Sequence, residues 1–152
     1  MRKLLNLFLL VFIATALLNI SVAASTVLLH ESGHYLMGLL TECKNVRFVL
    51  IDQNLGTYTE MNCPHEQPAY FPIIGAFLLT LPYALLFFLL DKLPEKNLFF
   101  IVLGFNLLIS ASDLPPVQIL QYLSLTAGGI LVSIGEFLFI DKLLLFVTKV
   151  EI

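Results

Sequence analysis

The stretch His30-Glu31-Ser32-Gly33-His34 decides how the rest of the chain is interpreted. It lies within an apolar run that covers residues 26–29 before it and 35–40 after it. On a helix, residues i and i+4 share a face, so His30 and His34 present two imidazole nitrogens to one ion while Glu31 stands beside it. The alternative is two buried core histidines that flank a glutamate by chance. A charged side chain costs roughly 2.5–3.5 kcal/mol at the centre of a bilayer. A glutamate placed there by chance is therefore a poor explanation of Glu31, and the metal site is favoured.

The composition of the chain is that of a membrane protein. Hydrophobic residues make up 59% of the sequence and charged residues 12%, and the mean hydropathy is +0.93. A soluble domain carries about 25% charged residues. The length of 152 residues predicts one membrane-embedded domain over residues 1–152, in contact with the lipid bilayer. The net charge of -3 and the lack of a basic block indicate no nucleic-acid partner, and the oligomeric state is not indicated.

Hydropathy predicts an all-α polytopic membrane protein with about five transmembrane helices and a small β-hairpin between the second and the third. About 20 residues cross the hydrocarbon core, so we divide the first apolar run near Asn19-Ile20-Ser21. The second of the two resulting helices then carries the motif near its middle. The expected spans are about 4–18, 22–40, 69–90, 97–112 and one within 117–147. For the first, a cleavable signal peptide is the alternative, because the basic start and Ser21-Val22-Ala23 have that form.

The polar segment from about 41 to 68 predicts the hairpin. Residues 46–51 and 57–61 are β-prone, and the residues between them favour a turn. One interpretation of the hairpin, 46–61, is a simple polar connection. The other is a substrate-binding role, in which an exposed strand edge holds an extended peptide by β-augmentation.

Both cysteines, Cys43 and Cys63, fall in this segment, and we expect two unpaired thiols. A disulfide requires the segment to face an oxidising compartment. Metal ligation by Cys63 with the nearby His65 is a second alternative.

The orientation in the membrane is only weakly indicated. With two spans before the hairpin, an inside N-terminus puts the hairpin inside as well, and the basic residues then give only a weak preference for either orientation.

Asp113 is the best candidate for a third metal ligand. It ends an apolar segment, has no charged neighbour in sequence, and is followed by prolines that break a helix. A catalytic zinc site takes three protein ligands and leaves the fourth position to water, and a carboxylate oxygen suits zinc. The alternative is an aspartate in interfacial water at a helix end. Glu136, in the last apolar stretch, is a further functional candidate unless Lys142 or interfacial water satisfies it.

These residues resemble the site-2 protease family of intramembrane zinc metalloproteases. The family pattern is H-E-x-x-H in one transmembrane helix, often with Gly before the second His, as at Gly33. A later helix supplies an Asp within a segment of the type N-x-x-P-x-x-x-x-D-G. The second motif departs from that form here. Asn106 precedes Asp113 by seven residues, Ile109 stands where Pro is usual, and Leu114 replaces Gly, so no role is carried over to Asn106.

The resemblance covers roughly residues 22–116 and implies metal-assisted hydrolysis of peptide bonds. His30, His34 and Asp113 would hold one zinc ion, and Glu31 would be the catalytic base. The implied substrates are transmembrane or membrane-associated proteins, and the implied location is a multi-pass position in the plasma membrane. Two other functions stay open. One is a catalytically inactive zinc-binding membrane protein, such as a pseudoprotease or partner protein, and the other is a metallopeptidase whose site opens to the outer face.

Overall fold

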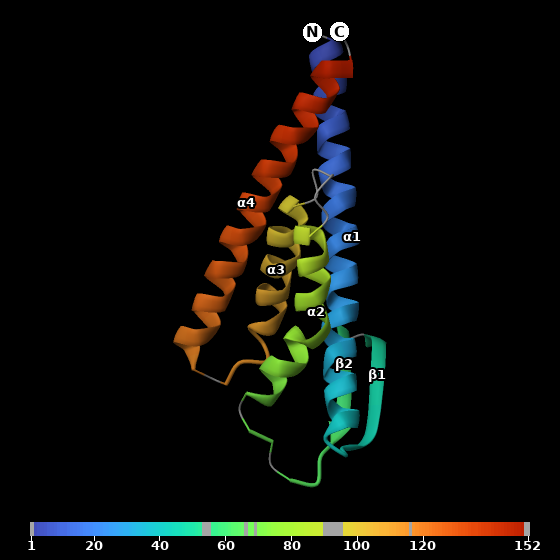
Figure 1. The fold of residues 1–152 in the computed structure, drawn as a ribbon, viewed down its shortest axis with the longest axis vertical. Coiled ribbons are helices and arrows are strands. Elements are labelled where there is room, and N and C mark those ends of the chain that lie inside the picture. The colour runs from blue at the N-terminus through green and yellow to red at the C-terminus, as the bar shows by residue number, and fades with distance from the viewer. Residues whose placement is uncertain are drawn as a thin grey trace.

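The computed structural model describes residues 2–52, 56–65, 67–68, 70–89, 96–115 and 117–150. These residues form four helices and one two-stranded sheet. The helices are α1 (Arg2–Leu40), α2 (Phe71–Leu89), α3 (Lys96–Ser110) and α4 (Gln118–Val150), and the strands are β1 (Lys44–Asp52) and β2 (Gly56–Asn62). In Figure 1, α1 and α4 meet at the end that holds both termini. The shorter helices α2 and α3 lie between them, and the hairpin lies beside the C-terminal half of α1.

The break expected near Asn19-Ile20-Ser21 is absent, because α1 is one helix of 39 residues. Asn19 Nδ2 donates to the carbonyl of Thr15 at 3.0 Å, and Ser21 Oγ donates to the carbonyl of Leu17 at 2.8 Å. Both polar side chains therefore bond to the preceding helical turn and do not interrupt the helix. The prediction of about five transmembrane helices is wrong, since its first two segments are a single element.

Two helices in the described part of the chain are long and apolar enough to cross a membrane. They are Leu5–Leu40, within α1, and Phe71–Leu89, which is α2. The apolar part of α3, Asn97–Ser110, is shorter than such a span. Signal sequences near an N-terminus meet the same criterion as α1, so that alternative stays open for its first residues. Residues 90–95, which connect α2 to α3, lie outside the described residues.

The predicted hairpin is present. β1 and β2 pair antiparallel, with Phe48 opposite Thr59, and the turn residues 53–55 lie outside the described residues. Glu42 and Asn45 have φ angles of 60° and 54°. These left-handed conformations turn the chain out of α1 and into β1. Thr59 Oγ1 donates to the backbone carbonyl of Glu31 at 2.8 Å, which holds β2 against α1.

A disulfide between Cys43 and Cys63 closes the base of the hairpin. The expectation of two unpaired thiols is wrong, and Cys63 is not available as a metal ligand beside His65. The strand register explains the pairing. Lys44 lies opposite Asn62, so the two cysteines, each one residue further out, become neighbours although 20 positions separate them in sequence.

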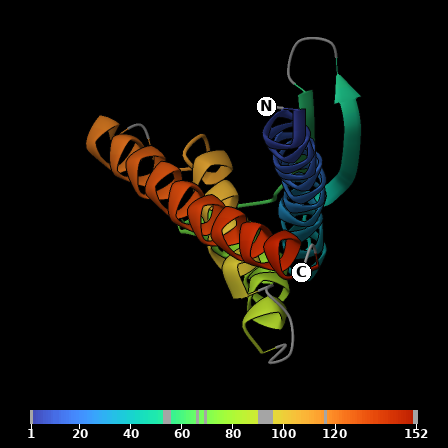
Figure 2. The same cartoon turned by 90° about the horizontal axis from the view of Figure 1, so that it is seen from above.

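The helices pack through small residues and one apolar cluster. A Cβ at Gly104 of α3 would lie 2.7 Å from the carbonyl oxygen of Gly128 in α4, so these helices approach as closely as their backbones allow. Buried side chains of α1, α2 and α3 form the cluster: Val22, Ala84, Ile101 and Val102. Figure 2 shows α1 nearly end-on, with the hairpin on one side and α4 on the other. This packing sets α3 beside the motif of α1.

Candidate metal centre

His30 and His34 lie one turn apart on the same face of α1, as their spacing predicts. Their Nε2 atoms are 3.2 Å apart, and their rings meet edge to face with centroids 4.8 Å apart. His30 is 1% exposed and His34 8% exposed. The two imidazoles therefore direct one nitrogen each to the same point in the protein interior.

Asp113 reaches that point from the turn after α3. The backbone N–H of Asp113 donates to the carbonyl of Ser110 at 3.0 Å, which closes the turn before Pro115. Asp113 Oδ2 lies 2.8 Å from His30 Nε2 and 3.3 Å from His34 Nε2. The three residues predicted as ligands thus form one group that has the composition and spacing to hold a metal ion.

The distances within this group suit zinc. Two ligand atoms at about 2.0–2.1 Å from a tetrahedral zinc ion lie roughly 3.3 Å apart. The three separations here are 2.8, 3.2 and 3.3 Å, so a small displacement of Asp113 completes the fit. Two imidazole nitrogens and one carboxylate oxygen are also a donor set found in catalytic zinc sites.

Asn106, on α3, determines which nitrogen of His30 faces the other two ligands. Its Oδ1 lies 3.0 Å from His30 Nδ1, and the side chain is 1% exposed. An amide oxygen only accepts, so Nδ1 carries the proton and Nε2 presents its lone pair. Histidine ligands commonly donate their second N–H in this way. Sequence reasoning assigned Asn106 no role. The available signal was its position seven residues before Asp113, about two helical turns along one face.

The converging atoms need a positive charge between them. With Nδ1 protonated, a neutral His30 turns a lone pair toward Asp113 Oδ2, and two acceptors at that distance repel unless a proton or a metal cation joins them. When the imidazole Nε2 atoms carry protons in place of a metal ion, burial still opposes ionisation of Asp113, but their hydrogen bonds outweigh it and lower the pKa of its carboxyl to about 2. Asp113 is therefore in the anionic form that metal binding requires.

Glu31 lies beside the ligands with a free carboxylate. The residue is 8% exposed, and among the described residues its carboxylate makes no hydrogen bond or ion pair. Its backbone is fixed by the hydrogen bond from Thr59. A buried, unpaired carboxylate next to a metal site is available to exchange a proton with water, as a general base must be.

A close approach of α1 and α2 leaves room for the ring of His34. A Cβ on Gly33 would overlap the carbonyl oxygen of Gly75, and a Cβ on Gly75 would lie 2.6 Å from His34 Nδ1. Any larger residue at either position must displace a helix or the ring. The motif pattern pointed to Gly33, but Gly75 has no signal in the sequence beyond being a small residue in an apolar helix.

The structure does not bring every candidate to the site. Glu136 lies partly buried in α4 and is not part of the metal-binding group. The hairpin reaches the motif through Thr59, and no described contact identifies it as a substrate-binding surface. Comparison of the chain with protein-family models, curated proteins and solved structures finds no match. The resemblance to site-2 proteases therefore rests on the motif residues alone.

Proposed function

We propose that this chain is a membrane-embedded zinc metalloprotease that hydrolyses peptide bonds in transmembrane or membrane-associated proteins. One observation carries the proposal: His30 Nε2, His34 Nε2 and Asp113 Oδ2 converge within 3.3 Å of one another, with the unpaired Glu31 beside them. The donors come from α1 and from the turn after α3, which are far apart in sequence. Two histidines that were buried in the core by chance would have no reason to face a carboxylate from a second element.

Each residue of the site has a distinct role in hydrolysis. His30, His34 and Asp113 hold the metal, and Asn106 keeps His30 in the tautomer that presents Nε2. A zinc ion bound there supplies Lewis acidity, which activates water and polarises a peptide carbonyl. Glu31 accepts the proton of the attacking water and passes it to the leaving amine.

The surface of α1 supports a location in the membrane. Large apolar side chains cover its N-terminal half and are more than half exposed, among them Leu5 (57%), Phe8 (66%), Phe12 (62%) and Leu17 (60%). A contiguous apolar surface of this kind is covered by lipid or by protein in a stable assembly. With α2 as a second candidate span, it supports a multi-pass membrane protein, and the proposed location is the plasma membrane.

The inactive alternative is a protein that holds zinc for structure or assembly. Structural zinc sites are closed by four protein ligands, whereas catalytic sites take three and leave a position for water. Within the described residues three side chains form the group here. The number of ligands and the free carboxylate of Glu31 favour the enzyme.

The test compares the unaltered protein with Glu31→Gln, purified in detergent and incubated with a panel of transmembrane peptides. Glu136→Gln is the matched control, because it removes a partly buried carboxylate outside the metal-binding group. We expect all three proteins to retain zinc. Glu31→Gln should lose at least about 100-fold in cleavage rate, the range for a lost general base. Cleavage that survives in Glu31→Gln contradicts the assigned base, and zinc without any cleavage supports the inactive alternative.

A further inference from the structure

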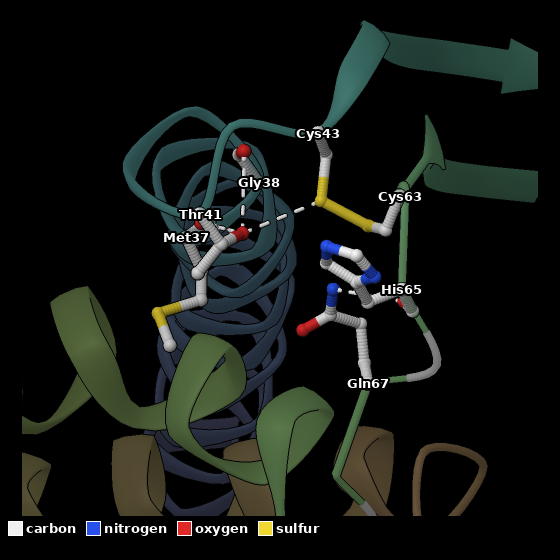
Figure 3. Close-up of a disulfide and its surroundings, with 7 residues drawn as sticks. All are labelled: Met37, Gly38, Thr41, Cys43, Cys63, His65 and Gln67. Atoms are coloured by element: carbon white, nitrogen blue, oxygen red, sulfur yellow. Dashed lines mark hydrogen bonds between the residues drawn. A yellow bond between two sulfur atoms is a disulfide. The ribbon is translucent and has the colours of Figure 1, made fainter.

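The disulfide identifies the compartment that the hairpin faces. Figure 3 shows the bond joining the residue that precedes β1 to the residue that follows β2, with Thr41 beside Cys43 and His65 near Cys63. Thr41 Oγ1 lies 3.3 Å from Cys43 Sγ. Disulfides persist in the periplasm, in the endoplasmic reticulum lumen and at the cell surface, whereas the cytosol keeps thiols reduced. A hairpin closed by this bond belongs to an oxidising compartment.

The continuity of α1 puts its N-terminus on the opposite side. A helix without a break crosses a membrane once, and its 39 residues extend about 58 Å, well beyond the roughly 30 Å of the hydrocarbon core. Arg2 is then cytoplasmic when Cys43 is extracytoplasmic. A cleaved signal peptide leads to the same side for the hairpin, because its basic start also stays in the cytoplasm.

The basic residues give the same orientation independently of the disulfide. Of the eight Lys and Arg residues, Lys44 and Arg47 are at the hairpin end. Of the other six, Arg2 and Lys3 precede the apolar part of α1. Lys92 falls between α2 and α3 in sequence, and Lys96 is the first residue of α3. Lys142 and Lys149 lie in the second half of α4. The start of α1 and the end of α4 are neighbours, since Leu7 and Leu144 line one cavity and both termini share one end of Figure 1. The positive-inside rule assigns that end to the cytoplasm.

The metal centre lies at the hairpin end of every helix that builds it. His34 is six residues, or about 9 Å, from the end of α1, not near the middle of a span as the sequence predicted. Gly75, which contacts His34, is the fifth residue of α2. Asp113 is the third residue after the end of α3. A peptide segment outside the bilayer on this side is hydrated, so it becomes extended without exposing backbone groups to hydrocarbon.

We infer that the metal centre opens on the extracytoplasmic side, and that its substrates are segments of membrane-anchored proteins exposed on that side next to the bilayer. The side rests on the disulfide, the unbroken α1 and the basic residues at the start of α1 and in the second half of α4. The substrate class rests in addition on the proposed function.

Cysteine labelling of the full chain in bacterial cells tests the side without any need for activity. In the unaltered protein, the thiols should react with a maleimide only after reduction. In a Cys43→Ser, Cys63→Ser background, Arg47→Cys should react with a membrane-impermeant maleimide in intact cells, and Lys149→Cys only after the membrane is permeabilised. Free thiols without reductant, or the reverse labelling pattern, overturn the inferred side.

Two model substrates test the substrate class. Each carries the same peptide segment next to one transmembrane helix, on the extracytoplasmic side in the first and on the cytoplasmic side in the second. Co-expression with the unaltered protein should cleave only the first, and Glu31→Gln should cleave neither. Cleavage of the cytoplasmic segment overturns the inference. If neither is cleaved while the labelling pattern holds, proteolysis and the substrate class fail but the side of the metal centre stands.

Discussion

Asn106 Oδ1 lies 3.0 Å from Nδ1 of His30, and this contact joins α3 to the metal-binding face of α1. Both side chains are 1% exposed, so no water competes for either atom of the bond. The hydrogen bond orients the ring and selects the tautomer whose Nε2 meets Asp113. Asn106 therefore acts on the metal through His30, as a positioning residue.

Replacing Asn106 with Ala should weaken zinc binding by about 10–100-fold, the usual cost of losing such a partner. Competition with a zinc chelator measures the change. Asn106→Asp keeps an oxygen acceptor and should bind zinc more tightly than Asn106→Ala. The matched control is Asn97→Ala, another buried asparagine of α3, which should leave zinc affinity unchanged. Zinc binding by Asn106→Ala as tight as in the unaltered protein contradicts the positioning role.

Gly75→Ala should lower both stability and zinc affinity. Its Cβ would lie 2.6 Å from His34 Nδ1, so the ring or α2 must move, at a cost of about 1–3 kcal/mol. Gly129→Ala in α4 is the control, because nothing lies within 4 Å of its Cβ position and alanine favours a helix by up to about 1 kcal/mol. Thermal unfolding in detergent and zinc content check both variants. Equal unfolding temperatures for the two variants would show that the close approach at Gly75 is not tight.

Reduction of the Cys43–Cys63 disulfide should loosen the hairpin and leave the metal centre in place. Closing a loop of this length stabilises a fold by about 3 kcal/mol, and the loop here is the hairpin itself. The zinc ligands belong to α1 and to the turn after α3, so zinc content should not change. Limited proteolysis with and without reductant checks this: cleavage within residues 44–62 should accelerate.

A variant with Cys43→Ser and Cys63→Ser is the control for reduction, since reductant should have no further effect on it. Loss of zinc together with the disulfide would contradict the separation between the hairpin and the metal centre.

The sequence predicted the residues of the candidate site better than the helices that carry them. The spacing of His30 and His34 has a direct geometric meaning on any helix, and ligand chemistry then favoured Asp113. The roles of Asn106 and Gly75 depend on how α2 and α3 pack against α1. That packing follows from contacts between distant parts of the chain, which no local pattern contains.

The division of α1 failed for a physical reason. Asn19 and Ser21 are residues that favour turns, yet within a long apolar helix their side chains bond to carbonyl oxygens one turn earlier. The disulfide was missed because it depends on the strand register, which sets Lys44 opposite Asn62. The two errors are connected. With one helix before the hairpin in place of two, a cytoplasmic N-terminus puts the hairpin on the extracytoplasmic side, where a disulfide is stable.

Zinc stoichiometry of the purified protein tests the metal centre most directly. The unaltered chain and Glu31→Gln should each hold one zinc ion, whereas His30→Ala, His34→Ala and Asp113→Ala should each lose it after dialysis against a mild chelator. Circular dichroism checks that the helices remain in all variants. One zinc ion retained at full affinity in Asp113→Ala, or in a His30→Ala, His34→Ala double variant, would contradict the assigned ligands and the proposed enzyme with them.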